Sequence, residues 1–137
     1  MNNIYLYLNN PVDIPNSSPC QIDKITEVQD NSVDTFYLLD LLDYGVEETY
    51  ASMLDVIQSK LKKDGAIVIQ APDIKQLIIA ITFNKINFNY GRSVLYSDRL
   101  HMYTMSEIIN MMKKYNYDCI IKKYINTFEY FLEFKKI

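Results

Sequence analysis

The middle of the chain reads as a strand, a helix and a second strand in direct succession. Val33 to Leu39 is a nearly unbroken apolar run that is too short for a useful helix. Val46 to Leu61 then repeats apolar residues every three or four positions, as an amphipathic helix does, and Ala66 to Gln70 is a second short apolar run. Two strands bridged by a helix pair in parallel through a right-handed crossover. We therefore expect an α/β protein with a mostly parallel sheet.

The details of this unit lead to further expectations. The apolar run Val33 to Leu39 predicts helices on both faces of the sheet. Glu47 and Glu48 in the first turn of the helix and Lys60 in its last turn would suit the helix dipole. Gly65 is expected to end the helix in the left-handed conformation that glycine tolerates best.

The segments on either side of this unit are less regular. Ile4 to Leu8 is β-rich and predicts a strand, whereas residues 11–21 hold three of the four prolines and predict an irregular connection. Ile74 to Phe83 follows a strand and predicts a helix on the face of the sheet. Residues 84–100 predict a long loop, and long loops are often functional.

The C-terminal part has two clear signals. Thr104 and Glu107 form a capping-box pattern, which predicts a helix running to about Tyr115. Cys119 to Tyr124 and Phe128 to Lys135 then alternate like the two strands of an antiparallel hairpin. With no internal repeat or linker in the sequence, we expect residues 1–137 to form one domain.

Composition narrows the classes of function. A net charge of −3 argues against a nucleic-acid partner, because phosphate binding needs a basic surface. Cys20 and Cys119 are isolated and are expected to be free thiols of a cytoplasmic protein. One histidine cannot complete a Cys/His zinc set, so no metal is expected. The start lacks a cationic leader, which predicts no signal peptide. The apolar stretch Leu77 to Phe83 is too short to span a membrane, and we expect no membrane partner.

Several short motifs occur in an order that is similar to one enzyme family. Val28 to Asp34 (VQDNSVD) resembles the segment P-F-x-D-N-S-F-D, and Leu42 to Tyr44 stands where L-E-H follows the next strand. Leu61 to Gly65 (LKKDG) is similar to L-K-P-G-G, and Pro72-Asp73 to the P-D after the following strand. His101 precedes the last apolar helix. From about residue 21 onward, the chain thus resembles class I S-adenosylmethionine-dependent methyltransferases.

This resemblance implies a shortened Rossmann-like sheet that is flanked by helices and completed by an antiparallel hairpin. It also implies S-adenosylmethionine as cofactor and methyl transfer to a small-molecule or glycan-type acceptor. One departure is large: the family's glycine-rich turn [DE]-x-G-x-G-x-G is missing after the first strand, where IYLYLNNPVD stands. The alternative is therefore a non-catalytic descendant that serves in binding or assembly. A shortened N-terminal half would also leave one side of the sheet poorly covered. Because uncovered strand edges tend to pair with other chains, we expect that the protein could form a homo-oligomer.

Acidic residues provide the candidate cofactor site. Asp40 and Asp43 follow the strand Val33 to Leu39, at the end where open α/β sheets bind ligands. Asp40 is a candidate for both cofactor binding and catalysis, although both acids could instead cap the next helix. Asp23 is the nearest match to the family's acid that meets the adenine amino group, and the resemblance assigns it to the cofactor. Asp34 is interpreted as fixing the turn into the strand.

The region before the last helix provides the candidate substrate contacts. Histidine is the side chain whose charge ordinarily changes near neutral pH, so His101, the sole histidine, is a candidate general base. Arg99 could receive a carboxylate or phosphate of the substrate, and Tyr103 could line a pocket. The alternatives are a structural hydrogen bond for His101, a surface ion pair for Arg99 and ordinary packing for Tyr103.

Overall fold

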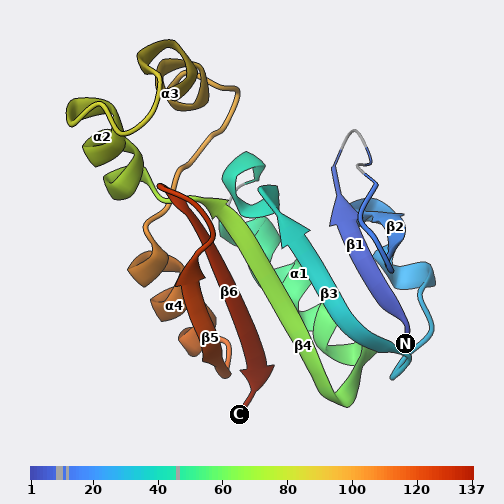
Figure 1. The fold of residues 1–137 in the computed structure, drawn as a ribbon. Helices are drawn as coiled ribbons and strands as arrows, with labels where there is room; N and C mark the ends of the chain where they lie inside the picture. The colour runs from blue at the N-terminus through green and yellow to red at the C-terminus, as the bar shows by residue number, and fades with distance from the viewer. Residues whose placement is uncertain (9–10, 12, 46) are drawn as a thin grey trace.

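The structure is a computed structural model that describes residues 1–8, 11, 13–45 and 47–137, without the side chains of residues 47 and 48. Its body is one six-stranded sheet with the strand order β2-β1-β3-β4-β6-β5 (Figure 1). The first four strands in chain order are parallel, and β4–β6 and β6–β5 pair antiparallel. The strands are β1 Asn3–Tyr7, β2 Ser18–Gln21, β3 Val33–Leu39, β4 Leu61–Pro72, β5 Tyr117–Tyr124 and β6 Glu129–Lys136.

The central strand–helix–strand unit is confirmed. β3 and β4 run in parallel, with Tyr37 beside Val68, and helix α1 (Glu47–Lys60) connects them. The expected end of the helix is wrong: α1 stops at Lys60, and Gly65 lies within β4 without a positive φ. Gly65 is needed for space, because a Cβ there would come within 3.1 Å of the Asp34 carbonyl oxygen. Val46, expected on the apolar face of the helix, lies outside the described residues.

The N-terminal connection holds a strand that the sequence did not predict. Residues 18–21, expected to be irregular, form β2 parallel to β1, with Leu6 beside Cys20. β2 is short and lies at the edge of the sheet, where Pro19 can be accommodated although it has no N–H to donate. A 3₁₀ helix, η1 (Ile22–Glu27), follows it.

Helix α2 (Ile74–Thr82) agrees with the prediction, but the long loop expected at 84–100 contains helix α3 (Phe88–Leu95). The side chain of Asn87 caps α3 by accepting a hydrogen bond from the Tyr90 N–H at 3.2 Å. Gly91 lets α3 approach α2 closely. Both helices lie beyond the end of the sheet rather than on its face (Figure 1).

The C-terminal predictions are confirmed. Helix α4 (Met105–Lys114) begins with a complete capping box, in which Thr104 Oγ1 accepts from the Glu107 N–H and Glu107 Oε1 accepts from the Thr104 N–H. β5 and β6 then form the antiparallel hairpin. Ile108 and Met112 on α4 are fully buried.

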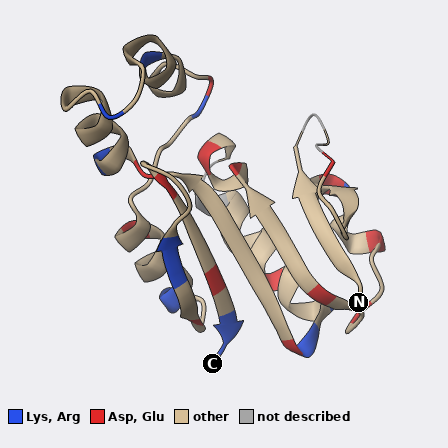
Figure 2. Cartoon of the chain, viewed as in Figure 1, with Lys and Arg blue, Asp and Glu red and all other residues tan. Residues whose placement is uncertain are grey.

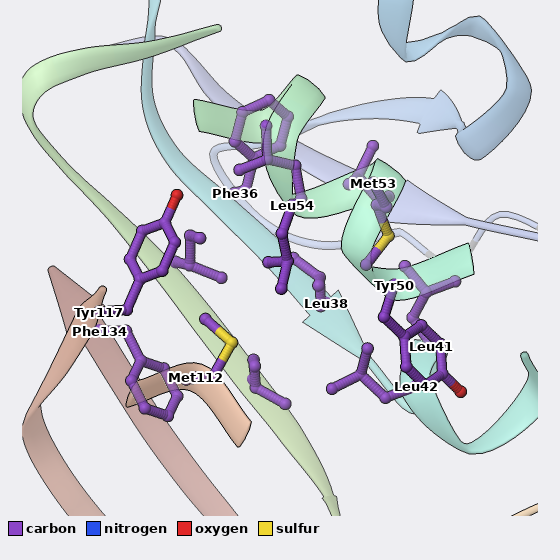
Figure 3. Close-up of a cluster of buried hydrophobic side chains, with 14 of the residues drawn as sticks. Phe36, Leu38, Leu41, Leu42, Tyr50, Met53, Leu54, Met112, Tyr117 and Phe134 are labelled. Carbon is purple, nitrogen blue, oxygen red and sulfur yellow. The ribbon is translucent and has the colours of Figure 1, made fainter. Parts of the chain in front are cut away.

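The hydrophobic core lies on one face of the sheet. Side chains of α1 and α4, including Leu54 and Met112, pack against Phe36, Leu38 and Phe134 of the strands (Figure 3). The alternate strand residues belong to the opposite face and do not join this cluster. Helices α1 and α4 thus cover one face of the sheet. The prediction of helices on both faces is not met by the described residues. Burial alternates along β3, and Thr35 and Tyr37 remain partly exposed.

Candidate functional site

The candidate site lies at the edge where the parallel strands end. Asp40 follows β3 directly and adopts a left-handed conformation with φ 58°. Its N–H donates to the Gln70 carbonyl at 2.8 Å, which holds the tip of β3 against β4. Aspartate is among the few residues that adopt this conformation readily. The backbone therefore fixes where the Asp40 carboxylate emerges from the sheet.

Asp43 lies one turn further on, in the 3₁₀ helix η2 (Leu41–Tyr44), and its side chain is fully buried. Its carboxylate oxygen Oδ2 accepts from Arg99 Nε at 3.0 Å. Its carbonyl accepts from the N–H groups of Leu100 and His101, at 2.8 and 3.0 Å. Asp43 thus fastens the segment 99–101 to the end of β3, and this pairing replaces the alternative in which it caps the next helix.

The guanidinium of Arg99 joins the two acids. Besides Asp43, it approaches Asp40 Oδ1 at 3.2 Å through Nη2 and donates to Ser97 Oγ at 2.8 Å through Nη1. Its carbon Cζ lies 5.4 Å from the centre of the Tyr44 ring. Only 13% of the Arg99 side chain is exposed, against 41% for Asp40. Asp40 is therefore the member of this cluster that a ligand can reach.

Burial changes the acid–base behaviour of the cluster. Burial raises the pKa of Asp43 to about 7; the Arg99 charge opposes this increase, and the Asp40 charge adds to it. Burial alone would lower the pKa of Arg99, but Asp40, Tyr44 and Asp43 together more than compensate and the pKa is raised. Arg99 stays charged, whereas Asp43 can take up or release a proton near neutral pH.

His101 and Tyr103 lie beside this cluster. Their rings are stacked, with centres 5.4 Å apart. His101 is exposed, while Tyr103 is partly buried and packs against the core. The structure therefore brings together four of the predicted site residues, namely Asp40, Arg99, His101 and Tyr103. Their roles in binding and catalysis remain predictions.

Asp23 stands apart from this group. It is exposed in η1 after β2, and β2 lies two strands away from β3. Strand spacing alone separates them by about 10 Å. Asp34 has the structural role that the sequence suggested: its carboxylate accepts from the Asn2 N–H at 2.6 Å and from Lys62 at 2.9 Å.

Sequence reasoning missed two buried residues near this edge. Tyr130 on β6 is fully buried, its hydroxyl has no hydrogen-bond partner among the described residues, and burial and the Asp43 charge raise its pKa. Asp73 is 3% exposed and accepts from the N–H groups of Gln76 and Met105 and from the Tyr124 hydroxyl. The alternation along β6 could have placed Tyr130 on the core face. The position of Asp73 directly before a helix is a capping signal for the Gln76 contact, but the sequence has no signal for its contacts with Met105 and Tyr124.

The acids at this edge suit a ligand that carries positive charge and hydrogen-bond donors. The Oδ1 atoms of Asp40 and Asp43 are both buried and accept no hydrogen bond from the described residues, although Asp40 Oδ1 pairs with the Arg99 charge. S-adenosylmethionine has a sulfonium cation, amino groups and ribose hydroxyls, so its chemistry fits the Asp40 side of the cluster. Among the described residues, no three or more His, Cys, Asp or Glu side chains are grouped to hold a metal ion.

No protein-family model and no curated protein matches the sequence. Several solved structures share the fold. The riboflavin-analogue dimethyltransferase of Streptomyces davawensis matches 88% of this chain and 35% of its own, at 8% identity and a TM-score of 0.63. The magnesium protoporphyrin IX methyltransferase of Synechocystis, solved with S-adenosylhomocysteine, matches 88% and 52%, at 12% identity and a TM-score of 0.55.

A third match is the 1,6-didemethyltoxoflavin-N1-methyltransferase of Burkholderia thailandensis, with 14% identity, 88% of this chain and 50% of its own, and a TM-score of 0.56. Its structure contains S-adenosylhomocysteine and the acceptor. This chain spans about a third to a half of the length of these three proteins. It therefore has a shortened class I methyltransferase-like fold.

Proposed function

We propose that this protein binds S-adenosylmethionine at the carboxyl edge of β3 and β4 and transfers its methyl group to a small-molecule acceptor. The observation that carries the proposal is the partly exposed Asp40 carboxylate at the tip of β3, held beside Arg99 and Asp43. Open α/β sheets bind their ligands at this edge. Solved proteins of the same fold carry S-adenosylhomocysteine.

Each residue would have a distinct part. Asp40 would accept hydrogen bonds from the cofactor and balance its positive charge, and Asp23 would approach the adenine from the β2 side. Arg99 has internal partners for all three nitrogens, so we assign it first to positioning Asp40 and second to the acceptor. His101 would remove a proton from the acceptor, and Tyr103 would line its site. The bound cofactor would supply the methyl group, and catalysis would consist largely of alignment. A glycan acceptor remains the alternative.

Calorimetric titration with S-adenosylmethionine tests this proposal. We expect binding in the micromolar range, weakened at least tenfold by Asp40→Ala. Asp64→Ala is the matched control, because Asp64 is an exposed aspartate on β4 outside the cluster. His101→Ala should bind the cofactor normally and lose methyl transfer. The absence of heat at millimolar ligand would refute the proposal.

The second candidate is a binding or assembly protein that has lost the cofactor. It is favoured by the glycine content, since the only glycines are Gly45, Gly65 and Gly91 and none follows β1. Residues 9, 10 and 12 of the turn after β1 lie outside the described part of the chain. A well-folded protein that gives no heat with S-adenosylmethionine or S-adenosylhomocysteine would support this second function.

A further inference from the structure

One face of the sheet is without a covering layer in the described structure. We call it the open face. It is turned toward the viewer in Figure 1, with α1 behind the sheet. Strand pairing places its side chains in three rows across the strands: Asn3, Thr35, Ala66, Lys135 and Asp118 in the first; Tyr5, Tyr37, Val68, Glu133 and Ile121 in the second; Leu39, Gln70, Phe131 and Lys123 in the third.

The middle of the open face is apolar and aromatic. Tyr37, Leu39 and Phe131 are partly exposed there, around the small buried side chain of Val68. Parallel sheets occur almost only with both faces covered. Among the described residues, only the Tyr5 end has some cover, where a shallow hollow is lined by Tyr5, Pro11, Asp13, Ile14, Ser17 and Pro19. An apolar sheet face of this kind marks a binding surface.

The size of the open face suits a second sheet. Strands lie about 4.8 Å apart and residues about 3.3 Å apart, so the five strands of these rows, β1, β3, β4, β6 and β5, at about six residues each, give roughly 24 by 20 Å. Two such faces bury on the order of 1,000 Å² together, which is the area that a specific interface should reach. Two sheets can pack face to face at about 10 Å.

The side chains also complement one another under a two-fold rotation. In these rows the residues of β1 and β3 are uncharged, whereas β6 and β5 contribute Glu133, Lys135, Asp118 and Lys123. Figure 2 shows acidic and basic positions on β6 and a basic stretch on β5. A half-turn about an axis along β4 places Val68 against Val68 of the second copy. β3 and β6 flank β4 and therefore meet: Tyr37 faces Glu133, Leu39 faces Phe131, and Thr35 faces Lys135. No two like charges meet.

We propose that the open face is the interface of a homodimer, with the two-fold axis running along β4. Each tyrosine hydroxyl of Tyr37 would donate to a Glu133 carboxylate of the second copy, and the apolar Leu39–Phe131 pairs would surround the axis. An axis across the strands through the Val68 row would instead bring Glu133 against Glu133. The contact would be isologous: the β1 and β3 half of each copy would pack against the β6 and β5 half of the other copy. This inference does not depend on cofactor binding.

Sedimentation equilibrium of the full chain between 1 and 100 μM, roughly the range of specific dimers of this size, tests the proposal. The wild type should have twice the mass of a single chain. Leu39→Lys should give a monomer, with dimer affinity at least tenfold weaker. The double variant Leu39→Lys/Phe131→Glu should restore the dimer, because opposite charges would then meet twice across the axis. Within one copy the two positions are separated by Gln70 on β4.

Ile78→Lys is the matched control, since Ile78 is 49% exposed on α2 and outside the open face. It should leave the dimer intact, and circular dichroism should confirm that all variants are folded. A wild-type monomer at 100 μM would overturn the proposal, even if another polypeptide covered the face. A dimer that survives Leu39→Lys, or that the double variant does not restore, would equally reject this axis.

Discussion

Asp43 carries a fully buried carboxylate against Arg99, and burial raises its pKa to about 7. The folded pKa lies above the unfolded value of 3.8, so the folded state binds the proton more tightly. The stability that protonated Asp43 contributes is complete below pH 4 and is lost as the pH rises through 7.

The substitution Asp43→Asn removes this titration. Between pH 5 and pH 8, the wild type should lose roughly 2–3 kcal/mol of unfolding free energy relative to the variant. Urea unfolding of both proteins across this range measures the difference, because their other groups titrate alike. Parallel stability curves would show that Asp43 is ionised throughout.

Tyr130 provides a second test at the level of single residues. Its hydroxyl is buried without a hydrogen-bond partner among the described residues, so Tyr130→Phe should stabilise the fold by about 1 kcal/mol. Tyr96→Phe is the control, since Tyr96 is 77% exposed and should not change stability. A loss of stability in Tyr130→Phe would reveal a buried partner, such as an ordered water.

At the level of elements, α2 and α3 depend on one glycine. A Cβ at Gly91 would come within 2.6 Å of Ile81 Cγ1 and 2.9 Å of Ile86 Cδ1. Gly91→Ala should therefore push the two helices apart, at a cost of about 1–3 kcal/mol that outweighs the better helix propensity of alanine. Hydrogen exchange should quicken in α2 and α3 and stay unchanged in β3 and β4.

The double variant Gly91→Ala/Ile81→Ala makes room for the added methyl group and should restore part of the protection. Equal exchange in Gly91→Ala and wild type would contradict the described contact between α2 and α3.

Asp73 joins three elements through one carboxylate. It caps α2, accepts from the first residue of α4 and accepts from Tyr124 at the end of β5. Asp73→Ala removes the cap and leaves buried donors unpaired, so we expect a loss of about 2–4 kcal/mol in urea unfolding. Asp64→Ala, at an exposed position, should cost less than 0.5 kcal/mol. Similar losses of unfolding free energy in both variants would show that Asp73 does not hold α2, α4 and β5 together.

Local sequence patterns predicted the elements whose signals are local. The apolar run of β3, the 3.6-residue repeat of α1 and the capping box at Thr104 each depend on neighbouring residues. β2 and α3 were missed because tertiary contacts decide them: β2 is four residues at a sheet edge, and α3 rests on Gly91 against α2. Asp43 was placed at the correct strand tip, but its burial depends on Arg99, 56 residues away.

At the level of the whole molecule, the chain keeps the carboxyl edge of a class I methyltransferase-like sheet in a shorter form. The three solved proteins compared above are about 1.7 to 2.5 times as long, and the described helices cover only one of its faces. No helix among the described residues is long and apolar enough to cross a membrane. Two surfaces of the molecule are therefore candidates for binding, the carboxyl edge with Asp40 and the open face.

The most direct test of the central claim is a nuclear magnetic resonance titration of the labelled protein with S-adenosylhomocysteine. We predict that the largest amide shifts fall at residues 40–44 and 99–103, with smaller shifts near Asp23 and none on α3. Unchanged spectra at millimolar ligand, or shifts centred on α3 instead of the strand tips, would contradict it.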